Sequence, residues 1–124
     1  MTKLAATERV QAALRAAGLD TRVLILEEST RTAALAAAAL SVPLGSIVKS
    51  LVFLADGKPV LVLVSGDRRV DEGKVARALG AHEVRLATAA EVKELTGYPI
   101  GGVPPIGHEH AIPVLVDAQL NRFE

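Results

Sequence analysis

Apolar and polar residues recur along the chain with two different periods, which predict helices and strands in a mixed order. Apolar side chains at helical spacing predict a first helix that Thr7 caps, that runs to about Ala17 and that Gly18 ends. Residues 21–26 are rich in β-branched and aliphatic side chains, so we expect a strand there. Residues 32–40 are almost all Ala and Leu, which predicts a second helix packed on more than one side.

The boundaries of this second helix follow from its flanking residues. Ser29 or Thr30 could cap its start, since short hydroxyl side chains satisfy the free amides of a first turn. Pro43 and Gly45 follow the apolar run and are expected to end it.

A hairpin is the strongest signal in the middle of the chain. Residues 47–54 and 59–65 both have the composition of strands, and Asp56-Gly57 between them favours a tight turn. Both strands are apolar on both faces, so we expect the hairpin to lie centrally in a sheet that is covered on both sides.

The second half of the chain alternates helices and short strands. Asp71 is expected to cap a helix that ends at Gly80, and residues 82–86 and 112–116 have strand character. Thr88 and Glu91 have the spacing of a capping box for a further helix that ends at Gly97. This order predicts an α+β fold in which helices pack on a mixed, largely antiparallel twisted sheet or partial barrel.

Composition narrows the class of protein. A chain of 124 residues that is half hydrophobic suits a single domain over residues 1–124. Fourteen basic and fourteen acidic residues balance, which argues against extensive wrapping of nucleic acid but permits binding of one strand end. The absence of cysteine excludes disulfides, thiolate metal sites and a cysteine nucleophile. Because no apolar run reaches the ~18 residues of a membrane span, and no signal peptide is evident, we expect a cytoplasmic protein.

Residues 97–107 form a loop in which glycine and proline alternate with apolar residues. Its amides at Gly101, Gly102, Val103 and Ile106 are expected to be free, and consecutive free amides can form a nest for an anion or oxyanion. A rigid structural turn would have the same composition. The pattern alone leaves both interpretations open.

Single polar residues offer further candidates. Lys49 shares a strand face with Leu51 and Phe53, so it either reaches solvent at the sheet edge or points into a polar pocket as a fixed cation. Arg68 and Arg69 could contact phosphate, or could be solvated in a polar turn. Ser65 precedes this turn and is a candidate substrate contact, and Asp117 could orient a neighbour or cap a turn.

The sequence gives little support for a metal site or for a serine nucleophile. His108 and His110 have a His-x-His spacing, but a zinc site needs a third protein ligand, and His82 lies in a distant strand. No nucleophile elbow, P-loop or dinucleotide fingerprint occurs. We therefore expect no metal and no cofactor, and a site that relies on positioning and electrostatics.

Two motifs together resemble a known family. The strand Ile47-Val48-Lys49-Ser50-Leu51-Val52-Phe53, followed by the loop Thr96-Gly97-Tyr98-Pro99-Ile100-Gly101-Gly102-Val103-Pro104-Pro105-Ile106-Gly107, is similar to the YbaK/ProX family. Members are free-standing relatives of the editing domain of bacterial prolyl-tRNA synthetase. Residues 30–33, 71–81 and 116–118 also fit, so the resemblance covers nearly the whole chain.

The resemblance implies hydrolysis of mischarged aminoacyl-tRNA in trans. The expected substrate is the tRNA for proline that carries cysteine or alanine instead of proline. It implies the tRNA acceptor end as partner, and prolyl-tRNA synthetase as a second one. The nucleophile would be water, the hydroxyl of the terminal adenosine or a substrate thiol. In that scheme Lys49 and the backbone of Gly101 and Gly102 are catalytic. From the polar turn described above, we further expect Arg68 and Arg69 to contact tRNA. Substrate contacts are expected from Tyr98, Val103, Pro104, Pro105, Ile106, Gly107, Ser65 and Asp117.

The chain also departs from this family. Relatives continue for about thirty residues beyond the Val116-Asp117-Ala118 strand end, with layers of the kind that complete a core, so the C-terminal family segment is expected to be absent here. Pro104 stands where many relatives have serine. Two other functions remain open on sequence grounds: a non-catalytic module that binds aminoacyl-tRNA, an aminoacyl-adenylate or a synthetase, and a hydrolase of small metabolites.

Overall fold

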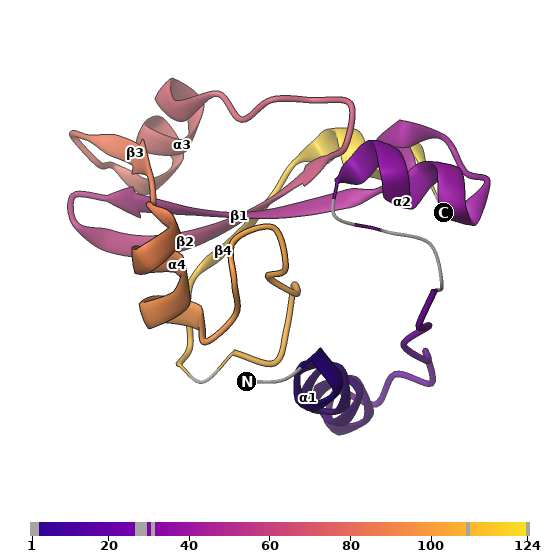
Figure 1. The fold of residues 1–124 in the computed structure, drawn as a ribbon. Coiled ribbons are helices and arrows are strands. Elements are labelled where there is room, and N and C mark those ends of the chain that lie inside the picture. Colours follow the sequence, from indigo (N-terminus) through magenta and orange to yellow (C-terminus); the bar gives the residue numbers. More distant parts are fainter. Residues whose placement is uncertain (1–2, 27–29, 31, 109, 124) are drawn as a thin grey trace.

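An open four-stranded mixed sheet is the centre of the fold in the computed structural model, which describes residues 3–26, 30, 32–108 and 110–123 (Figure 1). The strand order is β3-β1-β2-β4, and the two central strands pair antiparallel over their whole length. β3 joins β1 antiparallel, whereas β4 joins β2 in parallel. The predicted mixed, largely antiparallel sheet is therefore confirmed. The strands are β1 (Val48–Ala55), β2 (Lys58–Ser65), β3 (Val84–Leu86) and β4 (Val114–Val116).

Helices connect and cover these strands. Asp56 and Gly57 both have positive φ, of 50° and 80°, which is the geometry that joins two strands in a tight hairpin. Asp71 caps α3, and Thr88 with Glu91 forms the expected capping box at the start of α4. The helices are α1 (Lys3–Ala16), α2 (Ala33–Leu40), α3 (Glu72–Leu79) and α4 (Ala89–Thr96), with 3-10 turns η1 (Leu44–Ser46) and η2 (Ala118–Arg122).

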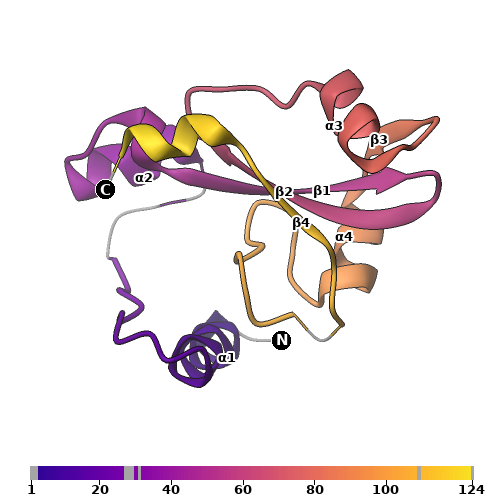
Figure 2. The same ribbon diagram turned by 180° about the vertical axis from the view of Figure 1, so that it is seen from behind.

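Both faces of the hairpin are covered, as its apolar pattern predicted. One buried cluster lies on the face of α4 and contains Val52, Leu54, Leu61, Ala87 and Val92. The other lies on the face of α3 and contains Phe53, Ala55, Val60, Val62 and Val75. The two helices appear on opposite sides of the sheet in Figures 1 and 2.

The start of β1 is a free sheet edge. β3 pairs only with residues 53–55 of β1, so residues 48–51 pair with β2 on one side alone. This free edge borders a hollow that α2 and the loop residues Gly101 and Val103 also line.

Three predictions near the N-terminus are wrong. Residues 21–26 form no strand, and the Gln11 side chain binds two of their backbone groups instead: it donates to the Thr21 carbonyl at 3.0 Å and accepts from the Val23 amide at 2.8 Å. Thr7 does not cap α1, which begins at Lys3. The second helix is not buried on several sides, since among its residues only Ala37 is buried.

The residues that cap α2 also differ from expectation. Thr32 is its N-cap, and its hydroxyl accepts from the Leu35 amide. Thr30 therefore does not cap this helix, and Ser29 lies outside the described residues. The helix ends at Leu40, as predicted, but its C-cap is Ser41 in a left-handed conformation with φ of 55°, so Pro43 and Gly45 follow the helix without capping it.

α1 packs on the Gly/Pro loop (residues 97–107) and not on the sheet (Figures 1 and 2). The Arg9 guanidinium lies 5.3 Å from the centre of the Tyr98 ring, and a Cβ added to Gly107 would meet Ala13 at 3.4 Å.

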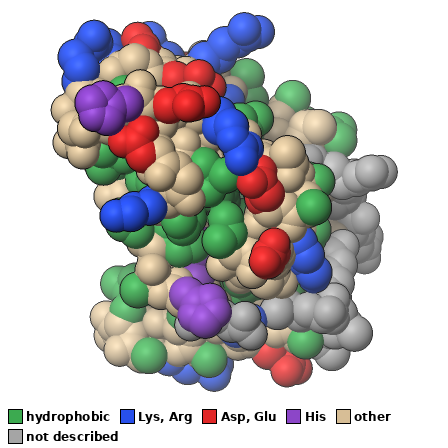
Figure 3. Space-filling view, turned by 90° about the vertical axis from the view of Figure 1, so that its left-hand side faces the viewer, with side chains coloured by type: hydrophobic (Ala, Val, Ile, Leu, Met, Phe, Trp, Pro, Cys, Tyr) green, Lys and Arg blue, Asp and Glu red, His purple; other side chains and the backbone are tan. Residues whose placement is uncertain are grey.

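Seen from the hairpin-turn end, basic and acidic side chains are interspersed (Figure 3). None of the described helices is long and apolar enough to cross a membrane.

Candidate functional site

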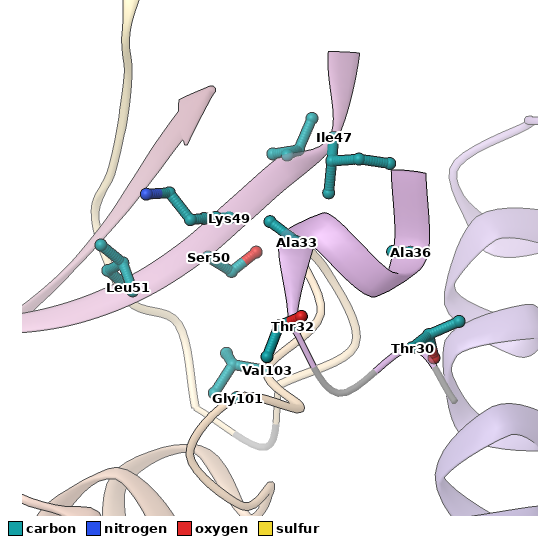
Figure 4. A pocket seen from close by; sticks show the side chains of 11 residues that line it. Thr30, Thr32, Ala33, Ala36, Ile47, Lys49, Ser50, Leu51, Gly101 and Val103 are labelled. Atoms are coloured by element: carbon teal, nitrogen blue, oxygen red, sulfur yellow. The ribbon is translucent and has the colours of Figure 1, made fainter. Parts of the chain in front are cut away.

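A hollow of about 290 Å³, here called the first hollow, lies where the free edge of β1, the start of α2 and the Gly/Pro loop meet (Figure 4). Among the described residues, three hydroxyl groups, several small apolar side chains and one lysine line it. The lining residues are Thr30, Thr32, Ala33, Ala36, Ile47, Val48, Lys49, Ser50, Leu51, Gly101 and Val103.

A hydrogen bond within the loop and apolar packing against the sheet fix the conformation of the Gly/Pro loop. The Gly102 amide donates to the Pro99 carbonyl at 2.9 Å, and Gly101 takes a φ of 80° that favours glycine. The side chain of Val103 packs against the buried cluster on the α4 face. The expectation that four loop amides are free is therefore wrong for Gly102, whose amide closes a local turn.

Tyr98, at the start of this loop, fixes its position through burial and hydrogen bonds. It is 1% exposed, its amide donates to the Thr96 hydroxyl at 3.0 Å, and its own hydroxyl donates to the Gly107 carbonyl at 2.7 Å. His108 adds a second tie, because its Nε2 lies 2.7 Å from the Pro104 carbonyl. Tyr98 and Pro104, both predicted substrate contacts, do not line the first hollow and hold the shape of its wall instead.

Lys49 lines the first hollow, yet its ammonium is held elsewhere. Nζ donates to the Arg68 carbonyl at 2.7 Å. Strand alternation places Lys49 on the face of Leu51, which packs on the α3 side, whereas Val103 packs on the α4 side. Figure 4 shows the Lys49 nitrogen directed away from Gly101 and Val103. The lysine and the loop thus share a hollow at the sheet edge, with the ammonium on the opposite side of the strand.

Ser50 of β1 lies on the strand face opposite to Lys49 and borders the first hollow beside the start of α2. Its oxygen points toward Ala33 at the start of that helix in Figure 4, and Thr32 borders the same space. Sequence analysis assigned no role to Ser50. The same alternation that turns Lys49 one way turns Ser50 the other way, and this signal could have identified it.

A larger hollow of about 480 Å³, the second hollow, lies between α3, β2, β4 and η2. Three of the predicted contact residues line it, namely Arg68, Arg69 and Asp117. Asp117 also caps η2, where its carboxylate accepts from the Gln119 amide at 3.0 Å. The structure therefore separates these residues from Gly101 and Val103.

Ser65 is fully buried in a polar cluster beside this hollow. Its hydroxyl contacts the Gly45 carbonyl and the Asp67 carboxylate, and it accepts from Arg122 Nη2 at 3.0 Å. Arg122 also pairs with Asp67 at 2.9 Å. Hydrogen bonds from Arg122 and then from Ser65 hold the pKa of the Asp67 carboxyl below its usual range. Ser65 thus fixes the turn that carries Arg68 and does not line the first hollow.

The remaining predicted contacts line a third hollow of about 190 Å³ on the far side of the loop. Pro105, Ile106 and Gly107 border it together with His108 and His110. Among the described residues, no group of three or more His, Asp or Glu could hold a metal ion. The two histidines therefore lack a third described ligand of the kind that a zinc site needs.

Comparison with known proteins identifies the family. Residues 27–124 match the family model described as "Aminoacyl-tRNA editing domain". The chain is 46% identical over 78 residues to a proline--tRNA ligase of Lactobacillus gasseri, and 46% identical over 85 residues to that of Solidesulfovibrio magneticus. These matches cover 63% and 68% of this chain, which spans only 14% of the length of either ligase.

A solved structure extends the match over the whole fold. It is described as that of a candidate trans-editing enzyme for prolyl tRNA synthetase, and it superposes with a TM-score of 0.89 at 44% identity. The alignment covers 99% of this chain and 77% of that one. The resemblance to the YbaK/ProX family is confirmed: the chain belongs to the aminoacyl-tRNA editing domain family.

Proposed function

We propose that this protein hydrolyses the ester bond of mischarged aminoacyl-tRNA, acting in trans on the product of a synthetase. The observation that carries the proposal is the first hollow, which in a chain of the editing family joins the two family motifs at one sheet edge. Its volume is at the lower end for small-molecule sites, which suits an amino acid joined to the terminal ribose.

The hydrolysis needs no nucleophile from the protein. Water would add to the ester carbonyl and give its proton to the ribose oxygen that leaves, which releases the free amino acid. With a cysteinyl substrate, the thiol could add instead, give its proton to the same ribose oxygen and release the amino acid as a thiolactone. Hydroxyl groups of Thr30, Thr32 and Ser50 are available to orient the substrate, and the rigid wall at Gly101 would limit its movement. Fixed geometry and fixed dipoles are recognised sources of catalysis.

The lining favours a small side chain on the substrate. Ala33, Ala36 and Val103 leave a narrow apolar space, which fits alanine or cysteine better than a bulky residue. We therefore propose that the substrate is the tRNA for proline wrongly charged with alanine or cysteine. We propose prolyl-tRNA synthetase as the partner, because the chain is similar to proline--tRNA ligases and to a candidate trans-editing enzyme for prolyl tRNA synthetase. Discrimination between such substrates is limited, because one methylene in an apolar pocket contributes only about 1–3 kcal/mol.

Lys49 would supply positive charge to this reaction. Because its ammonium is bound to the Arg68 carbonyl, it would have to leave that oxygen and turn around the free edge of β1 to reach the ester. The free edge makes this movement sterically open, since β3 does not pair with this part of β1.

The test is a deacylation panel with alanyl-, cysteinyl- and correctly charged prolyl-tRNA. We expect the wild-type chain to release alanine or cysteine, and Lys49→Ala to lower the rate by about 10²-fold, as for loss of one electrostatic donor. Lys58→Ala is the matched control, because Lys58 lies at the hairpin turn and does not line the first hollow. Equal rates for Lys49→Ala and wild type would remove Lys49 from the mechanism, and no release from any substrate would refute the hydrolase.

A second candidate is a module that binds aminoacyl-tRNA, an aminoacyl-adenylate or a synthetase without turnover. It is favoured by the engaged state of the Lys49 ammonium and by the lack of a histidine or carboxylate among the described residues of the first hollow. Titration with a non-hydrolysable aminoacyl-adenosine mimic, run beside the panel, separates the two. Tight binding without release of amino acid would select the module.

A further inference from the structure

We propose, building on the function above, that the second hollow binds a nucleotide of the single-stranded tRNA end next to the terminal adenosine. The ribose of the terminal adenosine and its amino acid would occupy the first hollow. The strand would then pass the free edge of β1 and place one phosphate and base against α3 and η2.

The second hollow has an apolar floor and a basic rim. Its floor consists of aliphatic side chains from β2, α3 and β4, namely Val62, Val64, Val75 and Leu115. Arg68, Arg69 and Lys74 stand at its rim. With about 480 Å³ it is larger than the first hollow and can accept a nucleoside with its phosphate. An apolar floor under a cationic rim suits a ligand with one planar apolar part and one anionic part, which is the chemistry of a nucleotide.

The rim cations are available to a ligand. In the part of the chain that the structure describes, neither an ion pair nor a hydrogen bond engages the side chains of Arg69 and Lys74. Among the described residues, the guanidinium of Arg68 donates a hydrogen bond to the uncharged Gln119 side chain at 3.1 Å and also acts on the Asp67 carboxylate through its charge, without a direct ion pair. These cations can therefore approach a phosphate without first breaking an ion pair.

Two carboxylates also line the second hollow, and both have structural roles. Asp71 accepts the Lys74 amide as the cap of α3, and Asp117 accepts the Gln119 amide as the cap of η2. Their charges oppose an anion, so the rim carries three cations against two carboxylates. This small excess suits one phosphate and not a polyanion, in agreement with the balanced charge of the whole chain.

Arg68 connects the two hollows. Its side chain lines the second hollow, while its backbone carbonyl accepts the Lys49 ammonium, and Lys49 lines the first. A strand that occupies both hollows would therefore pass the residue that holds the ammonium. This connection places the second hollow beside the proposed path of the substrate.

The test measures binding, so it does not depend on turnover. The probe is a fluorescent single-stranded RNA with the 3′ sequence of tRNA, titrated at several salt concentrations. We expect the double variant Arg69→Gln/Lys74→Gln to lose at least tenfold in affinity and to lower the slope of log K against log salt by about 0.7, because both cations are proposed to neutralise the same phosphate.

Lys58→Gln/Arg77→Gln is the matched control, because it also removes two positive charges and neither residue lines the second hollow. We expect its affinity to match wild type. The non-hydrolysable aminoacyl-adenosine mimic reaches only the first hollow, and the double variant should bind it within twofold of wild type. Unchanged RNA affinity in the double variant, or an equal loss for RNA and mimic, would overturn the proposal. Failure of the deacylation panel with this RNA result intact would count against the hydrolase alone.

Discussion

Tyr98→Phe isolates the hydroxyl that ties the Gly/Pro loop to its base. The Tyr98 ring is almost fully buried, and its hydroxyl donates to the Gly107 carbonyl at 2.7 Å. A net contribution of about 0.5–1.5 kcal/mol is typical for such a bond, and loss of the donor also leaves the carbonyl without this partner. We therefore expect the free energy of unfolding to fall by about 1–2 kcal/mol, which lowers Tm by roughly 3–8 °C for a domain of this size.

The assay is urea unfolding followed by circular dichroism, with a thermal melt as a second measure. The variant should shift the urea midpoint without a change in m, since the surface exposed on unfolding stays the same. Gly107→Ala gives an independent perturbation of the same contact. Gly107 has φ of 88°, and an added Cβ would lie 3.3 Å from the Tyr98 hydroxyl oxygen.

The two changes should not be additive, because both act on one contact. A double variant whose loss of stability is smaller than the sum of the two single losses would support the account. The reasoning is refuted if Tyr98→Phe unfolds within about 0.3 kcal/mol of wild type, or if the two losses simply add.

Two further predictions concern α4. The Arg85 hydrogen bond, and then the Thr88 amide, lower the pKa of Glu91 from 4.5 to about 2. Because this pKa is depressed in the folded state, the stabilisation is present above pH 4.5 and is lost as the pH falls toward 2. Glu91→Gln should melt below wild type at pH 7, and the difference should vanish near pH 2; a constant difference in Tm across this range would contradict the assignment. Thr96→Val removes the acceptor of the buried Tyr98 amide and should cost about 1–3 kcal/mol in urea unfolding, whereas Thr96→Ser should stay close to wild type.

Local signals predicted most of the fold because the elements they specify are complete in themselves. The Asp71 cap, the capping box at Thr88 and the Asp56-Gly57 turn each satisfy their own backbone groups within a few residues. Residues 21–26 failed for the opposite reason. Strand propensity describes a fit to a partner strand, and residues 21–26 pair with none of the four strands; Gln11 binds two of their backbone groups instead.

The site was only partly predictable for a related reason. Alternation along β1 correctly put Lys49 on the face of Leu51 and Phe53, but it could not say that the Gly/Pro loop would cover the other face. The distribution of Gly101, Arg69 and Pro105 over three hollows depends on how the loop and η2 return to the sheet. Such long-range packing leaves no periodic trace in the sequence.

The central claim is that the first hollow receives the aminoacyl end of tRNA. The most direct measurement is an amide NMR titration of the wild-type chain with a non-hydrolysable alanyl-adenosine mimic. The account predicts saturable shifts at Ser50, Gly101 and Val103, which line this hollow. Shifts confined to the second or third hollow, or no saturable shift at millimolar mimic, would contradict it.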